Sequence, residues 1–134
     1  MKKETESWLK IAYEDFQAAE NLMKIDLYRM VCYHSQQTVE KILKALLTEK
    51  EIEFERSHNI IDLKVAVMKV EYGVKISDED AVFLNSIYRS RYPSDAGLLP
   101  TGEPTKEDAE KALNIAQIIL QQVGGLLQIT KPED

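Results

Sequence analysis

The sequence predicts an all-α fold, an up-and-down bundle of about five helices in a single domain. Apolar residues recur at intervals of three and four along five separate segments, which is the period of an amphipathic helix. No segment shows the apolar–polar alternation that is typical of a strand. The 134 residues suit one domain with one core. We expect that domain to span residues 5–128, followed by a frayed tail at 129–134.

The first two predicted helices, residues 5–25 and 27–50, follow one another with almost no connection. The first carries an apolar stripe that consists of Trp8, Ala12, Phe16, Ala19 and Met23. The second carries a comparable apolar face that consists of Tyr28, Cys32, Val39, Ile42 and Leu46. Because the connection is so short, the two helices are expected to form an antiparallel hairpin.

Capping residues mark the starts of three further predicted helices, at residues 60–72, 77–92 and 105–129. The predicted caps are Ser57 or Asn59 for the first helix, Ser77 for the second and Thr105 for the third. An aspartate follows three residues after each of the last two caps, which is the pattern of a capping box. Gly73 and Pro93 are predicted to end the first two of these helices. The residues predicted to face the core are Ile60, Leu63, Val67 and Val70, then Val82, Phe83, Ile87 and Tyr88, then Ala109, Ala112, Leu113, Ala116, Ile119, Leu120 and Val123.

Composition and charge exclude several classes of protein. No apolar run is long enough to cross a membrane, and the N-terminus lacks the apolar segment of a signal peptide. Cys32 is the only cysteine, which excludes an intramolecular disulfide and suits a reducing compartment. The net charge of −6 disfavours non-specific binding to nucleic acid, because such binding depends on neutralising phosphates. We therefore expect a cytoplasmic protein with no membrane association.

Polar side chains form a stripe on the second predicted helix, within the segment YHSQQTVEKILKALL at residues 33–47. At about 100° per residue, His34 and Lys41 lie in one column, and Gln37 and Lys44 lie beside it. One interpretation is a solvated face, supported by Gln–Glu and Glu–Lys pairs four residues apart. The other two interpretations are an interface between the subunits of a dimer and a groove that faces a ligand.

The segment YRSRYP holds two of the four arginines, Arg89 and Arg91, at the end of a predicted helix. Arginine at a helix C-terminus interacts favourably with the helix dipole, which is a purely structural explanation. A guanidinium also binds two phosphate oxygens at once, and the neighbouring Tyr92 is suited to stacking on a base. The segment is therefore a candidate for phosphate recognition.

Other kinds of site find little support in the sequence. Cys32 and His34 are two residues apart and point in different directions on a helix, so no metal site is expected. His58 is the only other histidine, and it stands at a predicted helix start, where local hydrogen bonding is the common role. Paired carboxylates follow the predicted caps, where acidic side chains stabilise the helix dipole. No cofactor is expected.

The order of these segments resembles the HEPN domain family. The chain carries WLKIAYEDFQAAENLM, then YHSQQTVEKILKALL, then SHNIIDL, then SRYP and an Ala-rich last helix. The resemblance covers residues 8–127, and its most specific part is the run QQTVEKILKALL followed in order by SHN and RYP. It implies a bundle of about five helices that forms homodimers. It also implies association with a minimal nucleotidyltransferase, as in toxin–antitoxin modules.

Some proteins of this family are metal-independent ribonucleases, in which four to six residues separate an arginine from a histidine in a late helix, and a polar residue commonly follows the arginine. No histidine follows Arg89 or Arg91 in this sequence. Arg29 and His34 have the required spacing, but they lie in an early helix, Met30 follows the arginine, and Gln36 stands where the toxin subgroup has tyrosine. The resemblance therefore implies a non-catalytic member.

We expect a protein that binds a nucleotide or serves as partner subunit of a nucleotidyltransferase. One alternative is a metal-independent ribonuclease that uses Arg29 and His34, and another is a structural dimeric adaptor. The candidate site joins the polar stripe to the RSRYP turn. Its candidate residues are His34, Gln37, Lys41, Lys44, Arg89, Arg91 and Tyr92.

Overall fold

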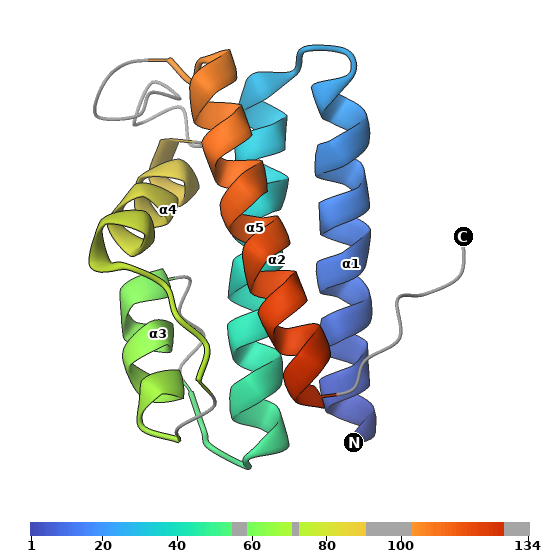
Figure 1. Ribbon diagram of the computed structural model, residues 1–134, viewed down its shortest axis with the longest axis vertical. Helices are drawn as coiled ribbons and strands as arrows, with labels where there is room; N and C mark the ends of the chain where they lie inside the picture. Colours follow the sequence, from blue (N-terminus) through green and yellow to red (C-terminus); the bar gives the residue numbers. More distant parts are fainter. Residues whose placement is uncertain (55–58, 71–72, 91–102, 128–134) are drawn as a thin grey trace.

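The structure is a computed structural model that describes residues 1–54, 59–70, 73–90 and 103–127. These residues form five helices, and no strand occurs among them (Figure 1). The helices are α1 (Lys3–Met23), α2 (Tyr28–Glu49), α3 (Ile60–Met68), α4 (Asp78–Ser90) and α5 (Lys106–Leu127). The predicted all-α class and the number of helices are confirmed.

The long helices α1, α2 and α5 run side by side, and the shorter α3 and α4 lie on the other side of α2 (Figure 1). Helix α2 is the central element, because it contacts each of the other four. The expected antiparallel hairpin joins α1 to α2 through a tight turn. There Asp26 has φ of 60°, and Leu27 donates its backbone N–H to the Leu22 carbonyl at 3.2 Å. None of the helices in the described ranges is long and apolar enough to cross a membrane.

Most of the predicted apolar faces form the core, but Val70 is only half-buried and the side chain of Tyr88 lies outside the described ones. Ala12, Phe16 and Ala19 of α1 are buried, and so are Val39, Ile42 and Leu46 of α2. In α4, however, Val82 is 54% exposed, so the prediction that it faces inward was wrong. Ile87 is buried as predicted, and Ala81 and Leu84 face the core with it. These three residues are three apart and share one helix face, whereas Val82 is turned about 100° away from Ala81.

The helix starts use the capping residues that the sequence predicted. The Asn59 side chain accepts hydrogen bonds from the backbone N–H groups of Ile61 and Asp62, at 2.9 and 3.3 Å. The Ser77 hydroxyl accepts from the Asp80 backbone N–H at 3.0 Å. Thr105 and Asp108 cap each other reciprocally: each side chain accepts from the other residue's backbone N–H, at 2.9 and 3.2 Å.

The predicted end of the third helix was too late. Helix α3 ends at Met68 because its last turn tightens: Val70 donates its backbone N–H to the carbonyl of Val67, three residues back, at 3.1 Å. Gly73 does have the positive φ of 75° that favours glycine, but it lies beyond this helix and does not cap it. The predicted extensions of the last two helices, to residues 92 and 129, lie outside the described residues.

Candidate functional site

The polar residues in the middle of α2 are buried, although polarity alone would place them on the surface. Glu40 and Gln36 are fully buried, and Gln37 and Lys44 retain only 6% and 5% of their exposure. The solvated-face interpretation therefore does not hold for these four residues. His34 and Lys41 are half-buried. Because α2 has neighbours on several sides, its polar stripe lies inside the bundle.

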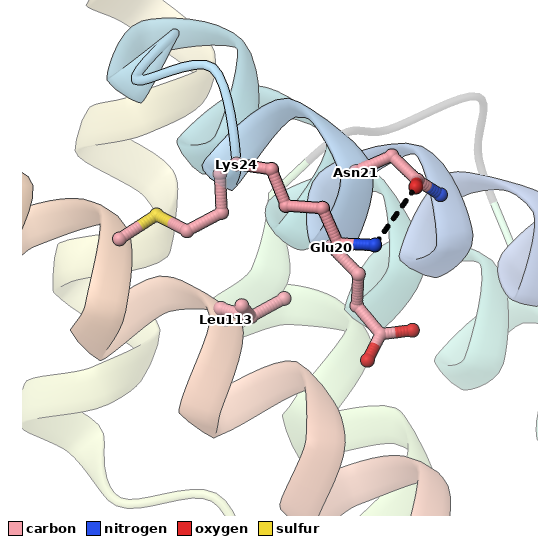
Figure 2. Close-up of a pocket in the computed structure, with 5 residues that line it drawn as sticks. Glu20, Asn21, Lys24 and Leu113 are labelled. Carbon is pink, nitrogen blue, oxygen red and sulfur yellow. Dashed lines mark hydrogen bonds between the residues drawn. The ribbon is translucent and has the colours of Figure 1, made fainter.

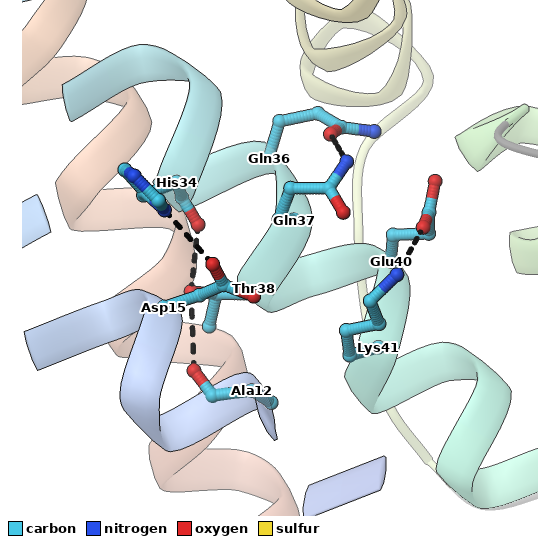
Figure 3. A network of polar contacts seen from close by, with 8 residues as sticks. All are labelled: Ala12, Asp15, His34, Gln36, Gln37, Thr38, Glu40 and Lys41. Atoms are coloured by element: carbon cyan, nitrogen blue, oxygen red, sulfur yellow. Dashed lines mark hydrogen bonds and ion pairs between the residues drawn. The ribbon is translucent and has the colours of Figure 1, made fainter. Parts of the chain in front are cut away.

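Glu40 holds two lysines with a single carboxylate oxygen. Its Oε2 accepts from Lys41 Nζ at 3.0 Å and from Lys44 Nζ at 3.4 Å, and Figure 3 shows the first of these contacts. The expected Glu–Lys pair four residues apart is thus present, but it is buried. Removing charges from water is costly unless they are paired, so this carboxylate stabilises both ammonium groups where they stand.

Two aromatic rings complete the surroundings of these lysines. The Nζ atoms of Lys41 and Lys44 each lie 5.6 Å from the centroid of the Trp8 ring, and Lys44 Nζ also lies 6.0 Å from the Phe54 ring. The two rings are 6.3 Å apart. An ammonium over an aromatic face is stabilised by the negative ring face. We call Trp8, Glu40, Lys41, Lys44 and Phe54 the lysine cluster.

Two glutamines lie next to the lysine cluster on α2. Gln37 donates its Nε2–H to Gln36 Oε1 at 2.8 Å (Figure 3). Gln36 Nε2 is buried without a hydrogen-bond partner among the described residues, and Trp8 Nε1 is likewise unpartnered there. A buried donor without an acceptor costs about 1–3 kcal/mol, so these two N–H groups can offer hydrogen bonds to a bound acceptor.

His34 is held by α1 and not by the lysine cluster. Its Nδ1 lies 2.8 Å from Asp15 Oδ1, and the Tyr33 ring lies 5.1 Å from the imidazole ring (Figure 3 shows the contact with Asp15). Arg29 points elsewhere, since its guanidinium pairs with Glu103 before the start of α5 at 2.9 Å. The structure therefore does not bring Arg29 and His34 together, as the ribonuclease alternative would require.

The second half of the predicted site lies mostly outside the described residues. The backbone of Arg89 belongs to α4, but its side chain is not among the described ones. Arg91, Tyr92, Ser57 and His58 also lie outside. It therefore stays a prediction that the polar stripe and the RSRYP turn form one site.

Sequence reasoning missed three partners in these contacts: Trp8, Asp15 and Phe54. Trp8 belongs to the apolar stripe that the sequence predicts for the first helix, and it does pack against the core. No spacing pattern along one helix reveals that a residue of a neighbouring helix lies over a lysine. For Glu40 the sequence predicts only a surface ion pair, because a glutamate four residues from a lysine is common on exposed helix faces.

Two surface pockets that described residues line lie beside the bundle, and neither carries an excess of positive charge. One, of about 350 Å³, is formed by Glu20, Asn21, Met23, Lys24 and Leu113 (Figure 2). The other, of about 500 Å³, adjoins the lysine cluster at Phe54, but its charged lining consists of three glutamates, Glu4, Glu51 and Glu53, against one lysine, Lys2. Like charges repel, so an anion is expected to reach the lysine cluster from another side. No group of three or more His, Cys, Asp or Glu side chains suited to a metal ion occurs in the described ranges.

Cys32 is predicted to resist alkylation in the native protein. Burial, with the nearby Asp108 as a smaller cause, raises the pKa of its thiol from about 9 to about 12. Only the thiolate attacks an alkylating reagent, so at pH 8 the folded protein should react far more slowly than the protein in denaturant. Iodoacetamide labelling followed by mass spectrometry measures both rates, and equal rates would contradict the burial of Cys32.

Comparison with known proteins agrees with the fold. The model of the HEPN domain family matches residues 5–126. "Putative toxin MJ1304" of Methanocaldococcus jannaschii is 36% identical over 135 residues, which cover 90% of this chain and 86% of that protein. The crystal structure of TT1696 from Thermus thermophilus has a TM-score of 0.75 at 26% identity, over 93% of this chain and 99% of that one. ST0689, described as an archaeal HEPN homologue, has a TM-score of 0.62 at 29% identity. The match covers 93% of this chain and 98% of that one. The chain belongs to the HEPN domain family.

Proposed function

We propose that this protein is a non-catalytic HEPN subunit that binds the phosphate of a nucleotide at the lysine cluster. The observation that supports this most is the imbalance of charge there. Among the described residues, two ammonium groups, with 17% and 6% of their side chains exposed, share one oxygen of a single buried carboxylate. Buried or half-buried charges are normally matched, so the excess positive charge favours an anionic ligand.

The neighbouring donors suit a nucleotide better than a simple ion. Lys41 is the more exposed of the two lysines and would contact the phosphate, while Lys44 would support it from inside. The Gln36 amide and the Trp8 indole have buried N–H groups without partners in the described residues, and both donate to oxygen or ring-nitrogen acceptors. Arg89, Arg91 and Tyr92 remain candidates for further contacts to phosphate and base.

A Lys41→Met variant is expected to weaken nucleotide binding at least tenfold. Methionine keeps an apolar side chain of similar length beside Trp8 but removes the charge, and a hydrogen bond to a charged group contributes about 1.5–3 kcal/mol. Isothermal calorimetry against ATP, GTP, AMP and a short single-stranded RNA measures the dissociation constants. We expect a mononucleotide to bind the unaltered protein at micromolar strength.

Lys10→Met is the matched control, because Lys10 is an exposed lysine of α1. It should bind the same ligands with unchanged affinity. If the unaltered protein binds no member of the panel, or if both variants bind equally well, the lysine cluster is not a nucleotide site.

We further propose that the protein works beside a nucleotidyltransferase partner in a toxin–antitoxin-like module. This role is supported by membership of the HEPN family and by the name of the Methanocaldococcus jannaschii relative, which calls that protein a toxin. Affinity purification of the tagged chain from its native cells tests this. Mass spectrometry should identify a nucleotidyltransferase in stoichiometric amount, and a chain recovered alone would contradict the role.

A further inference from the structure

Helices α3 and α4 are joined to each other at two places. At the start of α3, Asn59 Oδ1 accepts from Asn85 Nδ2 at 3.0 Å, and Asn85 Oδ1 accepts from the Ile60 backbone N–H at 2.7 Å. Further along α3, Lys64 pairs with Asp78 at the start of α4. The two contacts are about two turns apart on α4, so together they fix how the two helices lie against each other.

Helix α3 depends on α4 for its stability. It has nine residues, fewer than the roughly 12–15 that an isolated helix needs to be stable in water. Its capping residue, Asn59, is itself held by Asn85 of α4. If α4 moved away alone, the first N–H group of α3, that of Ile60, would also lose its acceptor. The two helices are therefore expected to move away from the bundle together.

The two helices cover the buried polar face of α2. Thr38 faces α1, because its hydroxyl donates to the Ala12 carbonyl at 3.3 Å. Gln36 and Glu40 lie about 160° and 200° around the helix from Thr38, so they face away from α1, as Figure 3 shows. Helices α3 and α4 lie on that side of α2 (Figure 1), and both side chains are fully buried. We call α3 and α4 together the α3–α4 cover.

The α3–α4 cover is held less extensively than the other helices, since α2 packs mainly against α1 and α5. The outer side of α3 exposes three apolar residues, so only one side of this short helix is packed. Helix α5 holds the cover through Gln122, whose Oε1 accepts from the Lys75 backbone N–H between α3 and α4 at 2.9 Å. Lys111 of α5 also lies over the Phe83 ring of α4, with Nζ 4.5 Å from the centroid. Elements with few buried contacts open locally at a low free energy.

The closed cover leaves a polar group of α2 unsatisfied. Gln36 Nε2 is buried without a hydrogen-bond partner among the described residues. Water reaches this amide only when the cover moves away, and the open state then gains a hydrogen bond that the closed state lacks. A bound ligand meets the same barrier, because a fully buried side chain is out of its reach.

We propose that the α3–α4 cover opens as one unit and exposes Gln36 and Glu40, while α1, α2 and α5 stay packed together. Gln122 is the latch that holds the cover to α5, and Asn85 is the tie that makes the two helices move together. The opening gives an anion a route to the polar stripe that avoids the acidic pocket at Phe54. This last consequence rests on the proposed nucleotide site, whereas the opening itself is measured without any ligand.

Hydrogen exchange of the full chain, followed residue by residue by NMR without ligand, tests the opening. The amides of α3 and α4 should share one degree of protection, at least about 100-fold below that of the slowest amides of α2. Gln122→Ala should speed exchange in both helices by the same factor, about three- to tenfold, because it removes one hydrogen bond of the cover. Gln121→Ala is the control, since Gln121 is an exposed neighbour on the same helix. Unrelated rates in α3 and α4, rates as slow as those of α2, or equal behaviour of the two variants would overturn the proposal.

Asn85→Ala tests the tie between the two helices. It takes the acceptor away from the Ile60 N–H, so α3 should now exchange at least about fivefold faster than α4. Ser86→Ala is the matched control, because the Ser86 hydroxyl donates to the Val82 carbonyl within α4 itself. It should leave the two helices with one common degree of protection. Equal protection of α3 and α4 in folded Asn85→Ala, as checked by circular dichroism, would rule out the tie.

Thiol labelling tests whether the opening exposes the polar face of α2. Gln36→Cys, in a chain that also carries Cys32→Ser, should be alkylated at a rate that Gln122→Ala raises by the same factor as the hydrogen exchange of the cover. Thr38→Cys in the same background is the control, because Thr38 faces α1 and its replacement should not respond to Gln122→Ala. An equal response of both thiols would mean that the whole bundle opens and would overturn the proposal.

Discussion

Replacing Glu40 by alanine is expected to lower the free energy of unfolding by about 3 kcal/mol. The carboxylate is fully buried and its Oε2 accepts from both lysines of the cluster. Without it, Lys44, whose side chain is only 6% exposed, would keep a positive charge that water cannot reach. Urea denaturation followed by circular dichroism measures the loss as a lower midpoint at an unchanged slope.

Two further variants separate this effect from the loss of a side chain in general. Glu14→Ala removes an exposed glutamate of α1 and should change stability by no more than about 0.5 kcal/mol. Adding Lys44→Met to Glu40→Ala removes the stranded charge, and should recover at least about 1 kcal/mol. If Glu40→Ala were as mild as Glu14→Ala, the carboxylate would not be the element that keeps the lysines inside the bundle.

The positions of the helices could be predicted because apolar residues recur at intervals of three and four along each one. Ala12, Phe16 and Ala19 face the core at spacings of four and three, so the stripe predicts both the helix and its buried side. Caps are equally local, since Thr105 and Asp108 need only each other. The end of α3 was harder to predict, because apolar residues continue beyond Met68 and only the tightened last turn ends the helix there.

The burial of the polar stripe could not be predicted in the same way. Periodicity divides a helix into an apolar and a polar side, and it assumes that the polar side meets water. Helix α2 violates that assumption because it contacts four other helices, so Gln36 and Glu40 are buried as completely as Ile42. Which neighbour covers a polar residue depends on how distant segments pack. That information is absent from the spacing along one helix.

The contacts around the lysine cluster could not be predicted for the same reason, because they join distant segments of the chain. Trp8 belongs to α1 and Phe54 follows α2, yet both rings lie within about 6 Å of Lys44 Nζ. From the sequence, Lys41 and Lys44 are binding or interface candidates because they interrupt a helix that must otherwise pack. The spacing along that helix does not reveal the rings that lie over them. The wrong prediction for Val82 has the same cause. A short amphipathic pattern predicts that it faces the core, but the packing of the helices leaves it exposed.

Leu46→Ala is the second large effect, with an expected loss of about 3 kcal/mol in the free energy of unfolding. Leu46 is fully buried in the central helix, next to the fully buried Leu43 and Leu47. A cavity at this position cannot be closed by moving one neighbour, because α2 is held by all four other helices. For a chain of this length the loss corresponds to a fall in Tm of about 10 °C, which differential scanning calorimetry measures directly.

The control for this change is Ile118→Ala, which removes apolar atoms from an exposed position of α5 and should alter stability by less than about 0.5 kcal/mol. An equal loss for both variants would mean that Leu46 is not in a tightly packed core.

Leu46→Ala and Glu40→Ala also differ in what they should do to the binding site. The first leaves the charges of the lysine cluster in place, so below its Tm it should still bind a nucleotide. The second removes the carboxylate that partly neutralises the two lysines, so the protein that remains folded should bind an anionic ligand at least as tightly.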